Sequence, residues 1–141
     1  MVTLAADAPR NVMLGDIQEY PVIADDIIYA GAAVGENGSG YARPLQAGDP
    51  FLGFADVKAD NAGGAAGDKR VRTRRRGTVR LTVAGATAIT ANDGAKVYAS
   101  DDNTFTLTAS TNTLIGTVDR WDGSTDCLVA FDAAVSALIA T

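Results

Sequence analysis

The sequence predicts an all-β protein, a small antiparallel β-barrel or sandwich with an extended N-terminal arm. Short stretches that are apolar or alternate apolar with polar residues are separated by turn sequences such as Asn37-Gly38 and Asp122-Gly123, a pattern typical of such folds. No long stretch shows the helical period. The length of 141 residues fits one domain. The hydrophobic fraction is 47% but the aromatic fraction only 6%, which predicts a thin core or one completed by neighbouring subunits.

Turn signals and alternation together place the expected strands along the chain. These strands cover residues 20–23, 27–34, 41–45, 51–57, 69–83, 95–100, 104–109, 113–121 and 127–131. Pro44 has no N–H to donate to a neighbouring strand, so its strand is expected at a sheet edge. Strict alternation in the strand 51–57 places Phe51 and Phe54 on opposite faces, so that Phe54 covers a second surface.

The segment from Lys69 to Val83 is the most unusual part of the sequence. It holds seven of the 12 Lys+Arg residues and no acidic residue. A helix would scatter its charges around the axis, whereas a strand places most of the arginines on one face and the apolar residues on the other. We therefore predict one long central strand. Its apolar face is most regular at Val79, Leu81 and Val83, and Arg75 on that side needs a carboxylate partner or a position at the end of the barrel. The other face carries a ladder of arginines, Arg70, Arg72, Arg74, Arg76 and Arg80.

This arginine ladder is the main candidate for a functional surface. Neighbouring guanidinium groups on one face repel each other unless an anionic group lies across them. The chain has a net charge of −5, whereas nucleic-acid-binding domains are generally basic. The acidity favours a protein interface over a solvated face or a polyanion site, and no direct contact with nucleic acid is predicted.

The two ends of the chain differ from the predicted β-domain of residues 17–132. Residues 1–16 show neither the helical nor the strand period of hydrophobic residues, and Pro9 interrupts any helical turn. This predicts an extended arm. The arm is either a loose terminus or a segment that orders on a partner. In the second case Val2, Leu4, Val12 and Leu14 are its candidate interface residues. Residues 133–141 form a short helix or a tail, because Val135, Leu138 and Ile139 would share one helical face.

Catalytic and metal-binding chemistry is poorly represented in the sequence. There is no histidine and only one cysteine, which removes imidazole-based catalysis and the common zinc sites. Cys127 lies in an apolar run and is expected to be buried. Asp25-Asp26 and Asp101-Asp102 fall in predicted turns; a weak Ca²⁺ site at Asp101, Asp102 and Asn103 is a minor alternative. We therefore predict no enzyme activity and no metal or cofactor.

Targeting signals are also absent from the sequence as given. Its first residues lack the basic start and apolar stretch of a signal peptide. No run approaches the ~20 apolar residues that a membrane span needs. We therefore expect synthesis in a cytoplasm and no membrane partner.

Several turn-and-strand motifs resemble small bacteriophage capsid cement, or head decoration, proteins. They lie in the segments 31–35, 43–54, 94–108 and 113–121, and the most specific part is Val-Tyr-Ala-Ser-Asp-Asp followed by Ile-Gly-Thr-Val. The resemblance runs from about residue 3 to 132 and rests on no catalytic signature.

The resemblance implies a structural virion protein without enzymatic activity. It would be made in the cytoplasm of a bacterial host and would bind the outer surface of the phage head. There it would bridge neighbouring major capsid protein subunits and hold the shell against the pressure of the packaged DNA. The implied partners are the major capsid protein and further copies of the chain, with a homotrimer favoured over a dimer. The alternative from another class is a small β-barrel module that binds a polyanion or another ligand.

Overall fold

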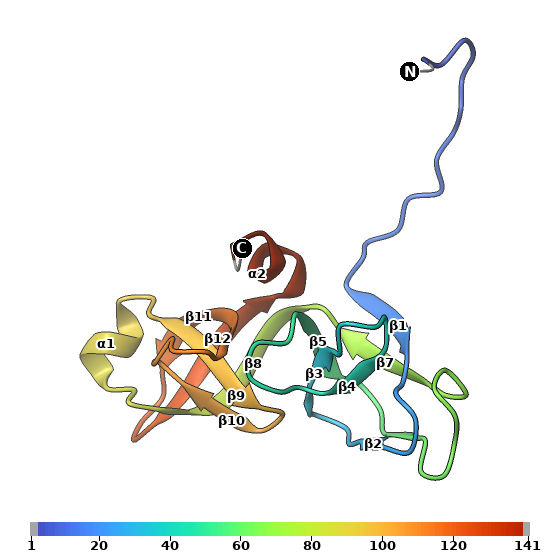
Figure 1. The fold of residues 1–141 in the computed structure, drawn as a ribbon. Coiled ribbons are helices and arrows are strands. Elements are labelled where there is room, and N and C mark those ends of the chain that lie inside the picture. Colours follow the sequence, from blue (N-terminus) through green and yellow to red (C-terminus); the bar gives the residue numbers. More distant parts are fainter. Residues whose placement is uncertain (1–2, 140–141) are drawn as a thin grey trace.

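The computed structural model describes residues 3–139 and confirms the all-β prediction (Figure 1). Five strands form an antiparallel sheet in the order β1, β7, β5, β3, β4. Their bounds are β1 Ile17–Pro21, β7 Arg70–Arg74, β5 Phe51–Ala55, β3 Ala33–Glu36 and β4 Ala42–Pro44. The strand β4, which contains Pro44, lies at the sheet edge as predicted.

A second group of five strands closes into a small barrel in the order β10, β8, β12, β11, β9. Their bounds are β8 Arg76–Ala84, β9 Lys96–Asp101, β10 Thr104–Thr106, β11 Thr113–Trp121 and β12 Asp126–Asp132. The pair β8 and β10 is parallel, and the other pairs are antiparallel.

Outside both groups lie the short strands β2 Ile27–Ile28 and β6 Ala59–Asp60 and the helices α1 Ala88–Asn92 and α2 Ala133–Ile139. Helix α1 begins at a capping box in which the Thr87 side chain accepts from the N–H of Thr90. The sequence did not predict α1, because five residues are too few to show a helical period.

The prediction of one continuous strand from Lys69 to Val83 was wrong. The segment breaks at Arg75 into β7 and β8, which belong to different sheets. The Arg75 N–H donates to the carbonyl of Asp16 at 2.8 Å, and the Arg75 carbonyl accepts from the N–H of Ala133 at 2.8 Å. Because its backbone N–H and carbonyl are bonded to these two segments, Arg75 does not pair with a neighbouring strand of the sheet or of the barrel. It lies where the barrel begins, and its guanidinium donates to the Tyr20 hydroxyl rather than to a carboxylate.

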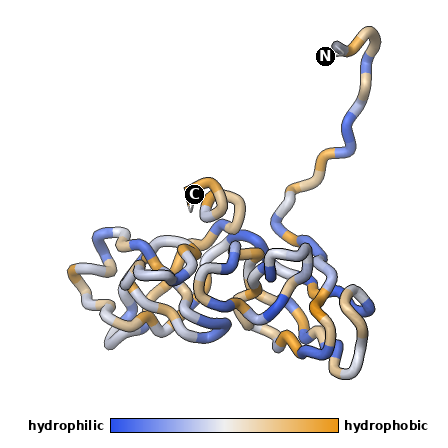
Figure 2. Tube along the Cα trace, in the orientation of Figure 1, coloured by the Kyte–Doolittle hydropathy of each residue, from blue (hydrophilic) through white to orange (hydrophobic). Residues whose placement is uncertain are grey.

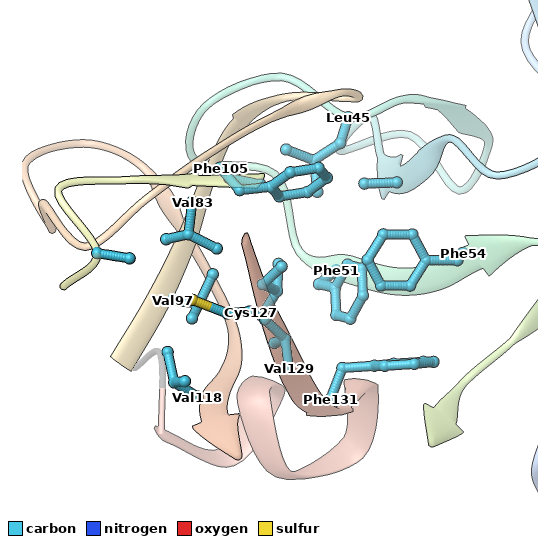
Figure 3. Packing of buried hydrophobic residues seen from close by; sticks show 14 of the residues in the cluster. Leu45, Phe51, Phe54, Val83, Val97, Phe105, Val118, Cys127, Val129 and Phe131 are labelled. Carbon is cyan, nitrogen blue, oxygen red and sulfur yellow. The ribbon is translucent and has the colours of Figure 1, made fainter. Parts of the chain in front are cut away.

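Phenylalanine side chains join the sheet to the barrel in one core (Figure 3). Phe51 and Phe54 come from the sheet, and Phe105 and Phe131 from the barrel. The Phe54 and Phe131 rings meet edge to face with centroids 4.8 Å apart, and Phe51 and Phe131 do so at 6.3 Å, a favourable arrangement for aromatic pairs. A second, smaller cluster that includes Val34 lies on the other side of the sheet.

Phe51 and Phe54 were predicted on opposite faces of their strand, and this was wrong. They lie in the same core with ring centroids 5.5 Å apart. The reason is Gly53, whose φ of +111° breaks the alternation where the register between β3 and β5 shifts. After this bulge Phe54 returns to the face of Phe51, and Ala55 joins the second cluster.

Gly53→Ala should therefore destabilise the protein by about 3 kcal/mol. A Cβ at this position would overlap the Arg74 carbonyl oxygen, in a backbone conformation that L-residues rarely adopt. Gly63 is the matched control, because its φ of +72° is also unfavourable but no heavy atom lies within 4 Å of the place that its Cβ would take. Gly63→Ala should cost about 1 kcal/mol. Urea denaturation measures both, and equal losses would show that the contact with Arg74 is unimportant.

Candidate protein interface

The arginine ladder is divided between the sheet and the barrel. On β7 the predicted alternation is confirmed, since Val71 and Thr73 are buried while the ladder residues Arg70, Arg72 and Arg74 are exposed. The other two ladder residues, Arg76 and Arg80, are exposed on β8. The break at Arg75 thus separates one predicted surface into two smaller ones.

Asp56, directly after β5, supplies a counter-charge that the sequence pattern did not indicate. Its carboxylate lies 3.5 Å from Arg72 Nε and 3.1 Å from Arg74 Nε. Its N–H donates to the Arg72 carbonyl at 2.8 Å, which fixes the carboxylate beside β7. Exposed ion pairs of this kind contribute at most about 1 kcal/mol. Asp56 relieves part of the repulsion along the ladder, so that an external anionic partner is less necessary than the sequence suggested.

The two ladder residues on β8 also contact other parts of the chain. Arg76 Nη2 donates to the Leu14 carbonyl at 3.0 Å. Arg80 pairs with Asp122 and lies 3.4 Å from Asp126. Among residues 3–139, neither Arg70 nor Arg76 forms an ion pair, so the ladder keeps an unpaired charge on each side of the break at Arg75.

The N-terminal arm extends away from the body before β1 begins at Ile17 (Figure 1). Its large apolar side chains are exposed, Leu4 by 68%, Val12 by 84%, Met13 by 75% and Leu14 by 81%. Val2, the remaining predicted arm residue, lies outside the described residues. The carbonyls of Leu14 and Asp16 bond Arg76 and Arg75, so the base of the arm is attached where β7 and β8 meet.

Helix α2 packs against β5, β11 and β12 and consists mainly of hydrophobic residues (Figure 2). It buries Ala133 and Ser136, while Val135, Leu138 and Ile139 are exposed by 47%, 79% and 54%. A mainly apolar groove of ≈ 360 Å³ runs along it. Besides the helix, the groove is lined by Leu114, Gly116, Ala130 and Phe131 of the barrel, together with the polar residues Lys96, Thr117 and Asp132. Sequence reasoning found the apolar helix residues but not the groove, which depends on how α2 packs.

A partly buried ion pair joins Arg43 of β4 to Asp49 in the turn before β5, a contact that the sequence did not indicate. Arg43 donates to both oxygens of Asp49, from Nε at 2.9 Å and from Nη2 at 2.7 Å. The hydrogen bond to Asp49 raises the pKa of Arg43 above its usual value. The Asp49 carbonyl accepts from the buried Thr113 hydroxyl at 2.8 Å. These bonds connect the sheet to β11, and we assign them a structural role.

The acidic turn at Asp101 and Asp102 stabilises its own backbone. The Asp101 carboxylate accepts hydrogen bonds from the N–H of Asn103 and the hydroxyl of Thr104, at 2.8 and 3.0 Å. Among residues 3–139 no group of three potential ligands is arranged to hold a metal ion. Burial, followed by the neighbouring charges of Asp101 and Asp26, raises the pKa of Asp102.

Cys127 is buried, as predicted. Burial raises the pKa of its thiol, and the nearby Asp126 raises it further. A thiol of this kind is mainly protonated near neutral pH and is a poor nucleophile.

No helix among the described residues is long and apolar enough to cross a membrane.

Comparisons with known proteins give no match, whether with family models, curated proteins or solved structures. The function is therefore inferred from the residues of the chain and their arrangement.

The raised pKa of Asp102 predicts a pH-dependent gain in stability for Asp102→Asn. An aspartate whose pKa is higher in the folded state lowers stability as the pH rises above its unfolded value, 3.8. The Asn variant should therefore unfold at a higher temperature than the wild type at pH 7, and the difference should vanish near pH 3. Thermal melts at both pH values measure this; Asp68→Asn, in an exposed loop, is the control. A difference of the same size at pH 3 would contradict a charge effect.

Proposed function

We propose that this chain is a capsid cement protein, which binds the outside of a phage head and bridges major capsid protein subunits. The observation that carries the proposal is the exposed apolar arm on a small all-β body. The resemblance of the turn-and-strand motifs supplies the identity of the partner. The proposal assigns the chain no catalytic role, in keeping with a sequence that has no histidine.

The arm is suited to binding a partner, because its apolar side chains and its extended backbone are both exposed. Apolar side chains of this size gain about 1.5–3 kcal/mol each when they are buried. An extended backbone can also add hydrogen bonds to the edge of a partner's sheet. On a capsid, such an arm would cross the seam between two subunits and hold them together, which is how a small protein reinforces a large shell.

The arginine ladder would contribute orientation more than affinity. Charged groups at the rim of an interface mainly guide association and select the partner. Arg70 has no ion pair within residues 3–139, and Arg72 and Arg74 share a single carboxylate, that of Asp56. The outer face of β7 therefore favours an acidic surface, either on the major capsid protein or on a sister subunit.

Replacing the apolar arm residues by serine should weaken head binding at least tenfold. The variant carries Leu4→Ser, Val12→Ser, Met13→Ser and Leu14→Ser, and it should fold normally because all four side chains are exposed. Binding is measured by cosedimentation with heads assembled from the major capsid protein of the same genome. Ile89→Ser, which changes an exposed residue of α1, is the control and should bind as the wild type does. Full binding by the arm variant would refute the role of the arm.

Arg72→Ser, Arg74→Ser and Arg76→Ser together should weaken head binding or oligomer formation, and raising the salt concentration should do the same to the wild type. The reason is the loss of attraction to an acidic partner surface. Cosedimentation and light scattering at several salt concentrations measure both effects. Arg120→Ser removes a charge outside the ladder and is the control. If the triple variant keeps its head occupancy and oligomeric state, the ladder is a solvated face.

The exposed guanidinium groups of β7 also favour the second candidate, a module that binds a soluble polyanion. That protein would be a monomer that binds heparin in a salt-dependent way. Light scattering of the purified chain separates the two, because the cement protein is expected to be a trimer or a dimer. Electron micrographs of heads with and without the chain test the cement function directly.

A further inference from the structure

Exposed apolar residues concentrate at the two ends of the described chain. Of ten large hydrophobic residues exposed within residues 3–139, seven lie in the arm or in α2. Four belong to the arm and three to the helix, whose groove is open beside them. In a monomer both apolar surfaces are exposed to water, and each could be buried against the other.

The arm and α2 also start from the same place. The Arg75 N–H bonds the carbonyl of Asp16 at the base of the arm, and the Arg75 carbonyl bonds the N–H of Ala133 at the start of α2. From there the two segments diverge, and the arm runs away from the helix (Figure 1). The bond from Arg76 to the Leu14 carbonyl holds the base in this direction. The arm is thus directed away from its own groove while the groove stays open.

We infer that residues Val12–Leu14 of one copy dock in the groove along α2 of a second copy. The inference rests on the proposed function, because it names the contact that would hold the oligomer together. Copies that meet on the face carrying Arg75 would place each arm beside a neighbour's helix, and a closed ring would satisfy every arm and every groove. Val12, Met13 and Leu14 would fill the apolar groove against Val135 and Ile139.

Charge is compatible with this contact. Lys96 and Asp132, the two charged residues that line the groove, form no ion pair among residues 3–139. The same holds for Asp7 and Arg10 of the arm. The arm carries Asp7 and Arg10 before its apolar residues, and the groove is lined by Lys96 and Asp132, so each surface brings one cation and one anion to the contact. The first residues of the arm, from Thr3 to Asp7, would extend past the groove and remain available for the capsid protein.

Disulfide trapping between two single-site variants tests the contact. Val12→Cys and Val135→Cys are prepared separately, one with a larger tag, then mixed and treated with a mild oxidant in the absence of heads. A mixed disulfide can form only between copies. We expect its yield to be at least five times that of the control mixture, Val12→Cys with Ile89→Cys, in which the second position lies exposed on α1. The native Cys127 is buried and should not compete.

Two results would overturn the inference. The first is a mixed yield no higher than in the Ile89→Cys control. The second is an internal disulfide in the Val12→Cys, Val135→Cys double variant at high dilution without any mixed product, which would mean that the arm covers its own helix. As a further measurement, Leu14→Ser with Ile139→Ser should lower the molar mass seen by light scattering, and an unchanged mass would also count against the contact.

The outcome is separable from that of the proposed function. If trapping fails but heads still bind the wild type and not the arm variant, the cement function stands and the arm contact between copies is wrong. If trapping succeeds but heads do not bind the chain, the contact stands and the cement function is wrong.

Discussion

The hydrogen bonds made by the backbone of Arg75 determine how the rest of this protein is arranged. Its N–H and its carbonyl bond Asp16 and Ala133 instead of neighbouring strands. The basic segment consequently changes from the sheet to the barrel at this residue. The same two bonds fix the base of the arm and the start of α2. One residue therefore sets the division of the body and the position of both segments from which an interface is proposed.

The two halves do not have separate cores, although they have separate sheets. Phe51 and Phe54 of the sheet pack with Phe131 of the barrel, and Thr113 of β11 donates to the carbonyl of Asp49. Aromatic residues are few in this chain, and all four phenylalanines are used at this junction. The core is thin elsewhere, with alanine and valine at most buried positions of the barrel. The joint between the sheets thus has the largest buried side chains, so it should also limit relative motion of the two halves.

The sequence predicted the strands and the charges better than their arrangement. Alternation on β7 and the edge position of Pro44 followed from local rules, and both were confirmed. The break at Arg75 could not be predicted, because it depends on partners about 60 residues away on either side of the chain. The bulge at Gly53 has a local sign, a glycine inside a strand, which strict alternation of side chains does not take into account. Counter-charges such as Asp56 and the groove along α2 were missed because their residues come from other elements, which only the folded register brings together.

These contacts change the relative weight of charge and apolar surface in the proposed interface. Ion pairs at an exposed surface contribute at most about 1 kcal/mol each and weaken with salt. Apolar side chains contribute about 1.5–3 kcal/mol each on burial, and seven of them are exposed in the arm and α2. Since Asp56 already lies between two arginines of β7, affinity should come mainly from the apolar ends of the chain. The arginines would then determine which surface is met and in which orientation, and that division of roles explains why a net acidic protein keeps a basic strand on its surface.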